Sequence, residues 1–513
     1  MKSLLDPKPA PIGLSLEVVV IGAGVGGLAA AIRLAVLGHK VRVLERLERV
    51  GGKLNLLELE GFRFDTGPSL VTLPWVFEDL FKAAGQKLSD HLELVRLEPI
   101  CRYRFADGSG FDAFSDMPRM MTSLEAFSLG AGEDFNAFFG QAARAWRGSR
   151  KAFLESAIQS PFDFVKDGIP WMDLTALLPF PSLHGLAKRF FRDPRMRQFI
   201  GRYATYTGSS PFLAPGTLST VLYSEYAYGA WYVKGGLYQI AVTLEKLARD
   251  LGVKFEFGVD VQRILLGDVT DFVMPTKQEF EVEGVQLEDG RKFLADAVIC
   301  NADAAHLYDD LLEAKFDPRA KKLEPSLSGF VMLLGLEGQT PNLEHHNMFF
   351  SKDYPLEFSQ IFRDLQPASD PSIYVAISSK SDPTQAPPGM ENWFVLVNAP
   401  STGRVNWSDQ SEAYSNLILT KLAGYGIDIR DRIRVKHIMT PTDLEERYRT
   451  FRGGIYGTSS NTVGSAFLRP QNRSSKLRGL YLASGSAHPG GGLPLVMLSG
   501  KLAVEMLIQD FSS

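Results

Sequence analysis

The stretch from Glu17 to Arg46 constrains the fold more than any other part of the chain. Val18 to Ile21 form a short apolar run, which is typical of a strand buried on both faces. After a glycine-rich turn, the Ala- and Leu-rich run from Leu28 to Leu37 predicts a helix, and Val41 to Leu44 predict a second strand. This order predicts a βαβ unit with a parallel sheet.

The turn carries glycines with the spacing G-x-G-x-x-G at Gly22, Gly24 and Gly27. The first glycine suits a tight turn, the second lets backbone approach a pyrophosphate, and the third lets the helix pack on the strand. Glu45 ends the second strand about twenty residues later, where a carboxylate can accept hydrogen bonds from a ribose. The helix N-terminus attracts an anion, so the unit predicts a dinucleotide site rather than a packing turn.

Composition excludes several classes of protein. The 513 residues suggest two to four domain-sized units, and the net charge of −4 does not indicate nucleic-acid binding. Cys101 and Cys300 are the only cysteines, which excludes a disulfide framework or a cysteine metal cluster and suits a reducing compartment. Residues 1–15 are Pro-broken and predict a flexible tail without a signal peptide.

Two further glycine loops follow Glu45 directly. Gly51-Gly52-Lys53 comes first, and a hairpin turning at Glu60-Gly61 then ends in Asp65-Thr66-Gly67-Pro68. Proteins that bind only NAD normally continue into further βα units, so these loops indicate a longer cofactor that needs several backbone contacts.

This beginning resembles the FAD-binding half of the amine oxidase and phytoene desaturase superfamily. Many members carry Arg where this chain has Lys53, which keeps the charge but not the bidentate reach. The C-terminal end resembles the closing motif of carotenoid desaturases: the predicted strand Gly479–Ala483 leads into Ser484-Gly485-Ser486-Ala487-His488-Pro489-Gly490-Gly491-Gly492, and a helix is predicted from Leu493. His488 either lies near the flavin ring or shapes the turn at Pro489.

The resemblance implies FAD as cofactor, no metal, and an α/β fold. That fold has a Rossmann-like FAD-binding domain of the GR2 type, a discontinuous mixed α+β substrate domain and a helical membrane-facing subdomain. The FAD-binding domain is expected at 16–85, 236–325 and 475–513, and the substrate domain at 86–235 and 326–474. The implied cofactor contacts are Gly22, Gly24, Gly26, Gly27, Glu45, Arg46, Gly51, Gly52, Lys53, Gly67, Pro68, Val261, Ala302, Asp303, Gly485, Gly492, Leu493 and Pro494.

The middle of the chain has a different pattern of apolar and aromatic residues. From about Gln86 to Lys234, helical patterns rich in aromatic residues are predicted to replace alternation. Within Ile169–Tyr203, apolar bulk lies beside clustered basic residues. This pattern fits a helix on an anionic membrane surface, and it equally fits a helical subdomain with its apolar side packed inward. The aromatic run Tyr203–Tyr232 predicts core or the wall of a long apolar pocket.

Later segments complete the predicted elements. A helix is expected at Leu237–Leu251, and strands are expected at Val253–Ile264, Ala297–Asp303, Ser328–Leu336, Ile373–Ser379 and Trp393–Asn398. His345 and His346 are adjacent and lack an acidic or Cys partner at useful spacing, so they are predicted to be surface residues rather than metal ligands.

The resemblance implies an FAD-dependent carotenoid desaturase that dehydrogenates C–C single bonds of a long polyene at a membrane surface. The protein would be cytoplasmic and peripherally membrane-associated, with oxygen or a quinone as electron acceptor. Alternatives within the superfamily are a hydroxycarotenoid 3,4-desaturase, a diapocarotenoid oxidase, a carotene isomerase and a flavin amine oxidase. A non-catalytic lipid-binding escort protein is a further alternative. The sequence identifies no catalytic base.

Overall fold

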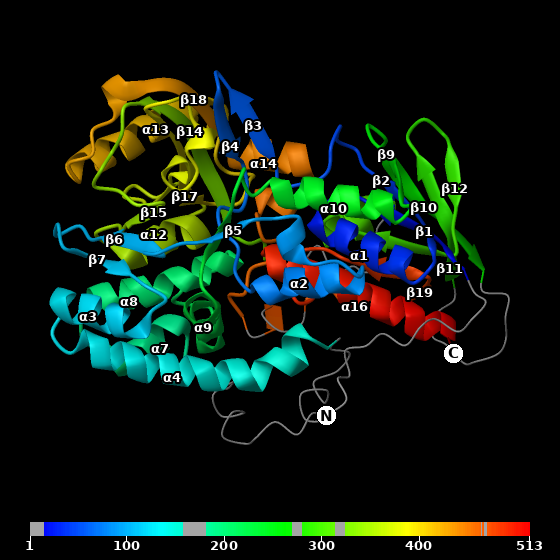
Figure 1. Ribbon diagram of the computed structural model, residues 1–513, viewed down its shortest axis with the longest axis horizontal. Coiled ribbons are helices and arrows are strands. Elements are labelled where there is room, and N and C mark those ends of the chain that lie inside the picture. Colours follow the sequence, from blue (N-terminus) through cyan, green and yellow to red (C-terminus); the bar gives the residue numbers. More distant parts are fainter. Residues whose placement is uncertain are drawn as a thin grey trace.

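The computed structural model describes residues 15–156, 181–268, 280–312, 324–462, 464–465 and 469–512, whose elements form two lobes (Figure 1). Most of the predicted tail, residues 1–14, lies outside the described residues. The same holds for residues 169–180 of the predicted membrane-facing stretch.

A parallel sheet of five strands forms the centre of one lobe. Its order is β20-β13-β1-β2-β9, and every neighbouring pair is parallel. The strands are β1 (Glu17–Ile21), β2 (Lys40–Leu44), β9 (Lys254–Glu256), β13 (Ala297–Cys300) and β20 (Leu480–Leu482). The predicted βαβ unit is confirmed, and segments from both ends of the chain contribute to this sheet, with β13 between β1 and β20.

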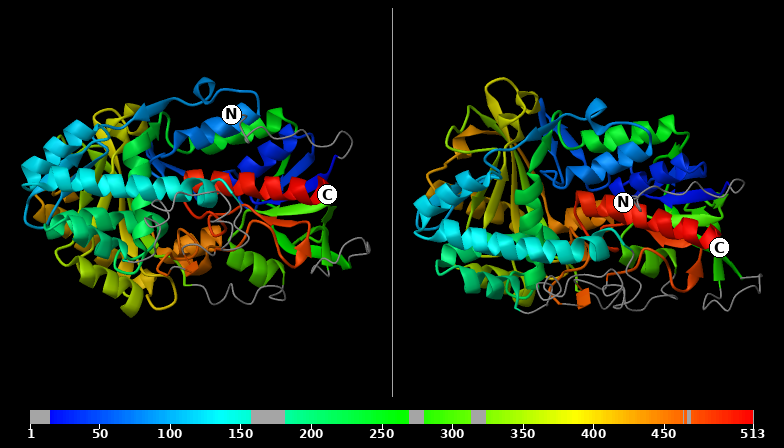
Figure 2. Two further views of the ribbon diagram at one scale, coloured as in Figure 1. Left: turned by 90° about the horizontal axis from the view of Figure 1, so that it is seen from below. Right: turned by 60° about the horizontal axis from the view of Figure 1, so that its bottom comes forward.

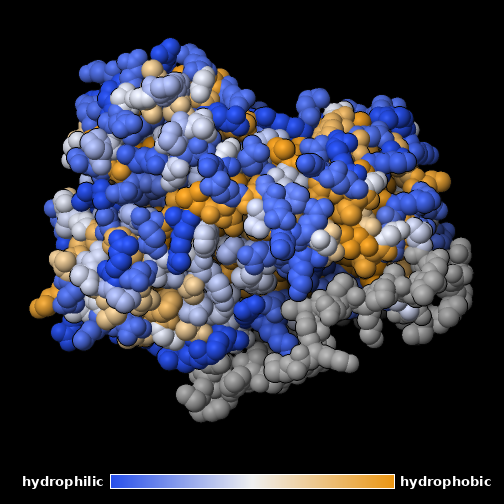
Figure 3. All heavy atoms as spheres, viewed as in Figure 1, coloured by the Kyte–Doolittle hydropathy of each residue, from blue (hydrophilic) through white to orange (hydrophobic). Residues whose placement is uncertain are grey.

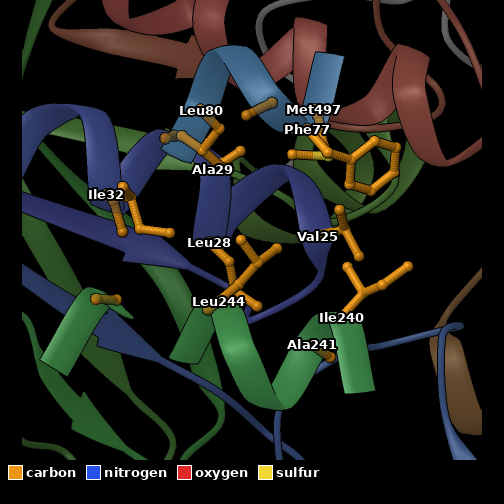
Figure 4. Close-up of a cluster of buried hydrophobic side chains, with 14 of the residues drawn as sticks. Val25, Leu28, Ala29, Ile32, Phe77, Leu80, Ile240, Ala241, Leu244 and Met497 are labelled. Carbon is orange, nitrogen blue, oxygen red and sulfur yellow. The ribbon is translucent and has the colours of Figure 1, made fainter. Parts of the chain in front are cut away.

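Helix α1 (Val25–Val36) is enclosed by three other helices: α2 (Pro74–Ala83), α10 (Gln239–Asp250) and α16 (Leu493–Ser512) (Figure 4). Leu28 is fully buried and faces Leu244 of α10, while Phe77 of α2 and Met497 of α16 close the other side. Burying a Leu side chain contributes about 1.5–3 kcal/mol, so this cluster holds the glycine turn at the start of α1 in place.

The predicted strand Val253–Ile264 is wrong in its extent. The chain turns at Gly258, whose φ is +65°, and therefore forms β9 in the parallel sheet and β10 in another sheet. That second sheet contains β10 (Val261–Asp268), β11 (Phe280–Leu287), β12 (Lys292–Leu294) and β19 (Leu477–Arg478).

A sheet of seven strands forms the centre of the other lobe. Its order is β18-β14-β17-β16-β15-β6-β7. The strands are β6 (Cys101–Arg104), β7 (Gly110–Ala113), β14 (Ser328–Glu337), β15 (His346–Phe349), β16 (Ile373–Ala376), β17 (Met390–Ala399) and β18 (Ile433–Met439). The three strands predicted after residue 325 are confirmed as β14, β16 and β17. The expectation of helices from Gln86 onward is corrected, because β6 and β7 extend this sheet.

Helices cover the seven-stranded sheet and make up the rest of its lobe (Figure 2). They are α3 (Met117–Phe127), α4 (Ala131–Ser149), α7 (Leu183–Phe190), α8 (Pro194–Gly201), α9 (Ser219–Tyr228), α12 (Tyr354–Ser359), α13 (Trp407–Gly424) and α14 (Pro441–Tyr448). Figure 2 shows α4 and α16 along the same side of the molecule, one in each lobe. In the described part of Ile169–Tyr203, Leu183, Phe191 and Phe199 are buried, so its apolar side chains pack inward.

Two small strand pairs join the lobes, namely β3 (Leu56–Leu59) with β4 (Phe62–Asp65), and β5 (Leu94–Arg96) with β8 (Trp231–Val233). On the face drawn in Figure 3, hydrophobic side chains gather across the middle of the molecule and over the lobe that contains α1. Within the described ranges, no helix combines the length and the hydropathy needed to cross a bilayer.

Candidate active site

A cavity of about 460 Å³ extends from the glycine turn of the first lobe to the seven-stranded sheet of the second. Gly22 follows β1, Glu45 follows β2, Asn301 follows β13, and Ser484 lies two residues beyond β20; all four line the cavity. Because these strands are parallel, their carboxyl ends meet at one edge of the sheet, which is where ligands bind in open α/β sheets.

The start of α1 faces this cavity. Gly24 is its N-cap and provides no side-chain cap, so N–H groups of the first turn remain available for a ligand. The Nδ2 of Asn301 donates to the carbonyl oxygen of Ala483 and so ties the loop after β13 to the loop after β20. An unpaired helix N-terminus with its positive dipole is a suitable place for a phosphate group.

Glu45 lies at the same edge and is buried. Its Oε2 accepts from the Ala23 N–H at 2.6 Å, and its Oε1 accepts from the Leu47 N–H at 2.8 Å. Burial raises the pKa of Glu45, and the two backbone hydrogen bonds oppose that shift. A carboxylate offers about four acceptor positions, so Glu45 can hold the turn and also accept from hydroxyl groups of a ribose.

The loop of Gly51, Gly52 and Lys53 runs alongside the glycine turn, and the Gly51 N–H donates to the carbonyl of Ala23 at 2.8 Å. The Nζ of Lys53 donates to the carbonyl of Ile455 at 2.9 Å. Burial lowers the pKa of Lys53, and the negative charge of Asp303 opposes the shift. All of these residues except Ala23 line the cavity. Lys53 therefore places an amino group on the wall between the lobes.

Asp65, in the second glycine loop, links the lobes because its side chain binds backbone N–H groups next to α10. Its carboxylate accepts from the N–H groups of Leu237 and Tyr238, just before α10, at 2.9 and 3.0 Å. Gly67 and Pro68 of the same loop lie on the cavity wall. Asp65 therefore holds the loop against the start of α10, while the residues after it face the cavity.

The C-terminal glycine loop also contributes to the cavity wall. Gly485, Gly492, Leu493 and Pro494 line the cavity, so the N-terminus of α16 faces it as the N-terminus of α1 does. The remaining predicted residues also lie on the wall, namely Arg46, Val261, Ala302 and Asp303.

Gly26 and Gly27 are the two predicted contacts that do not line the cavity. A Cβ at Gly27 would lie 2.2 Å from the Gly22 carbonyl oxygen, and one at Gly26 would lie 2.4 Å from the carbonyl oxygen of Ala483. Both positions therefore require glycine for the packing of α1 on its neighbours, which is the role expected of the third glycine in the turn.

From the aromatic run Tyr203–Tyr232, Tyr206 lines the cavity, but sequence reasoning missed the rest of its apolar end. There the wall is a row of side chains at one level of the seven-stranded sheet, namely Val331 on β14, Leu396 on β17, Tyr374 on β16 and Met348 on β15. With strands about 4.8 Å apart, the row spans about 14 Å. These four residues lie far apart in the sequence, so only the strand register brings them together.

Sequence reasoning also missed Arg449 and Asp260, two charged residues on the cavity wall. Arg449 pairs with Asp260, its Nη1 lying 2.8 Å from Oδ1 while Nη2 contacts the other oxygen, and both residues line the cavity. Arg46 donates to the carbonyl of Arg447. Basic residues on this wall suit the phosphate groups of a dinucleotide.

His345 and His346 are not surface residues, contrary to the prediction. They are 5% and 1% exposed, and burial lowers the pKa of both. His345 precedes β15, which begins at His346, and the two rings are in contact with their centroids 4.4 Å apart, so they do not face opposite sides. His488 is also buried; its N–H donates to Pro470 and its carbonyl accepts from Asn472, so it shapes the turn and does not face the cavity.

The cavity wall contains polar atoms without partners. Thr66 Oγ1, Tyr448 OH and Thr450 Oγ1 are buried and make no hydrogen bond within the described part of the chain, and all three residues line the cavity. Buried polar groups are nearly always hydrogen-bonded in folded proteins, so these atoms indicate that a bound polar molecule belongs here.

Comparison with known proteins agrees with this geometry. Residues 25–508 match the family described as flavin containing amine oxidoreductase. The chain is 34% identical to the 4,4'-diapolycopene oxygenase of Methylomonas sp over 500 residues, which cover 96% of this chain and 98% of that protein. It is likewise 34% identical to the 1-hydroxycarotenoid 3,4-desaturase of Flavobacterium sp. (strain P99-3), covering 96% of this chain and 99% of that protein.

A third relative is the zeta-carotene-forming phytoene desaturase of Myxococcus xanthus, also 34% identical, with 96% of this chain and 94% of that protein covered. Among solved structures, the fold is similar to that of an oxidoreductase from Methanosarcina mazei. The TM-score is 0.62 at 19% identity, and the match covers 95% of this chain and 100% of that one.

Proposed function

Because the chain belongs to the flavin-containing amine oxidoreductase family, we propose that it is an FAD-dependent carotenoid desaturase of the phytoene desaturase type. One observation carries this proposal: a single cavity joins a nucleotide-binding edge in one lobe to an apolar row in the other. A bound flavin supplies a two-electron oxidant that can take a hydride from an allylic carbon next to a C–C single bond.

The residues of this chain would hold the two halves of FAD at different places. The start of α1 and Glu45 suit the pyrophosphate and the adenosine ribose, because they offer N–H donors and a carboxylate. Lys53 and the N-terminus of α16 lie nearer the second lobe and suit the ring system. The unpartnered hydroxyl groups of Thr66, Tyr448 and Thr450 fit a polar cofactor along this path.

The apolar row suits a long polyene. Val331, Leu396 and Met348 offer no charge and no hydrogen-bond donor, so they favour a hydrocarbon chain over the cation that an amine oxidase must accommodate. Such a surface excludes water and positions the carbon chain, which is the main contribution that the protein makes to this reaction.

The proposal extends to location and electron acceptor. A polyene hydrocarbon partitions into the bilayer interior, so we place the enzyme at the cytoplasmic surface of a membrane, with oxygen or a quinone as acceptor. Relatives of equal identity that are named for different activities support a second candidate, a desaturase or oxidase of an oxygenated carotenoid.

Purified protein loaded with FAD can test this assignment. It is incubated separately with phytoene, a 1-hydroxycarotenoid and a primary diamine, and absorption spectra and chromatography follow each substrate. We expect a carotenoid to gain conjugated double bonds, seen as a red shift, and the diamine to remain intact. Consumption of the diamine, with neither carotenoid changed, would overturn the proposal.

A further inference from the structure

Arg202 is a buried cation on the wall of the apolar half of the cavity. It begins the helical turn Arg202–Thr207 directly after α8, and its exposure is 5%. Its guanidinium lies over the rings of Tyr103 and Tyr374, at 5.4 and 5.7 Å. Since Tyr374 belongs to the apolar row, Arg202 lies beside that row.

This cation has no counterion among the described residues. No carboxylate oxygen lies within 4.0 Å of its guanidinium there, and its one side-chain hydrogen bond in that part of the chain runs from Nη1 to the Tyr103 hydroxyl, at 2.5 Å. Arg remains protonated in proteins and carries five N–H donors. Contacts with aromatic rings offset part of the cost of burying this charge, yet most of its donors have no acceptor among the described residues.

The neighbouring polar groups are already engaged. The hydroxyls of Tyr203 and Tyr206 each donate to the carboxylate of Glu225, at 2.8 Å. The Tyr374 hydroxyl lies 2.7 Å from Ser69 Oγ and 2.6 Å from His346 Nδ1. Of the described groups in this part of the wall, Arg202 is therefore the one that keeps donors without an acceptor beside an otherwise apolar surface.

We propose that Arg202 binds an oxygen atom, a hydroxyl or a carbonyl, on the end group of the polyene substrate. This inference rests on the proposed function and names its substrate class: an oxygenated carotenoid rather than a pure hydrocarbon. An end-group oxygen supplies the acceptor that the buried guanidinium lacks. The carbon chain then lies along Met348, Tyr374, Leu396 and Val331, with its oxygen-bearing end at Arg202 and the reacting carbons toward the flavin.

A matched pair of substrates tests the proposal with the wild-type holoenzyme. Equilibrium binding of a 1-hydroxycarotenoid and of the hydrocarbon with the same polyene is measured by quenching of tryptophan fluorescence in detergent micelles. A hydrogen bond from a charged donor is worth about 1.5–3 kcal/mol, so we expect the hydroxylated member to bind about 10- to 100-fold more tightly. Equal affinity for the two members would overturn the proposal.

The variant Arg202→Met assigns that preference to one side chain. We expect it to bind the hydrocarbon as wild type does and to lose the preference for the hydroxylated polyene, with the change in KM and not in kcat. The control is Arg197→Met on α8, which removes an Arg that donates to the backbone carbonyls of Phe191 and Arg192 and does not line the cavity. The control should keep the preference.

A purely structural role for Arg202 predicts a different result. In that case Arg202→Met would weaken both polyenes equally, and the proposal would be wrong. If Arg202→Met does not retain flavin, Arg202→Lys replaces it, because it keeps the charge but not the forked donors; we expect a reduced preference and unchanged hydrocarbon binding. Should wild type bind and convert neither polyene, the proposed function itself fails.

Discussion

Asp65 shows how one carboxyl group couples the junction of the lobes to pH. Burial raises its pKa to about 6 from 3.8, although two backbone N–H groups donate to it. The folded protein thus holds this proton to higher pH than the unfolded chain does. Stability from this group is therefore present at about pH 4 and is lost as pH rises to about 6, by up to about 3 kcal/mol.

The variant Asp65→Asn should remove this dependence. Urea unfolding at pH 4.5 and pH 7 gives the free energy of unfolding. Relative to wild type, the unfolding free energy of the variant should be higher at pH 7 than at pH 4.5. Asp428→Asn is the control, because the hydrogen bond from Arg430 lowers the pKa of Asp428 to about 2, below the window. Equal pH slopes for Asp65→Asn and wild type would contradict the expected coupling.

Residues near one another in the sequence were the predictable part of the site. Gly22, Gly24 and Glu45 fall within one βαβ unit, whose spacing alone fixes their places at the sheet edge. Arg202 and Tyr374 meet only through strand register and helix packing, for which the sequence carries no local signal. His346 was misplaced because a two-residue pattern does not reveal that its strand lies inside a sheet covered on both faces.

At the scale of elements, the contact between α1 and α16 joins the two ends of the chain. A Cβ at Gly500 would lie 2.6 Å from the carbonyl oxygen of Gly26, so the two helices approach as closely as backbone allows. Both helices begin at the cavity, so this crossing fixes their positions relative to one another there. The C-terminal glycine motif was predictable, but this crossing was not, since Gly500 belongs to no recognisable spacing.

The variant Gly500→Ala should therefore push α16 away from α1. We expect a loss of about 1–3 kcal/mol in unfolding free energy, measured by denaturant titration, together with a lower flavin occupancy of the purified protein. Gly140→Ala in α4 is the matched change in a helix interior, where a Cβ would meet nothing within 4 Å. The unfolding free energy of Gly140→Ala should rise by about 0.5–1 kcal/mol. A Gly500→Ala protein as stable and as yellow as wild type would show that the close crossing is not required.

At the scale of the whole molecule, the cavity has walls from both lobes, so its ligand should stabilise them together. The five-stranded sheet contributes Gly22 and Glu45, and the seven-stranded sheet contributes Tyr374 and Leu396. A ligand that binds only the folded protein adds about 2.7 kcal/mol at a hundred times its Kd. Removal of flavin should therefore lower the unfolding temperature of both lobes.

Comparison of FAD with FMN locates this stabilisation. Flavin-free protein is titrated with each cofactor, and thermal unfolding is followed by circular dichroism and by tryptophan fluorescence. We expect FAD to raise the unfolding temperature saturably in both signals. FMN should do so much less, because it lacks the adenosine half that the α1 turn and Glu45 are placed to bind. If FMN stabilises the protein as well as FAD does, the glycine turn is not a nucleotide site, and the flavin must be held by the second lobe and α16 alone.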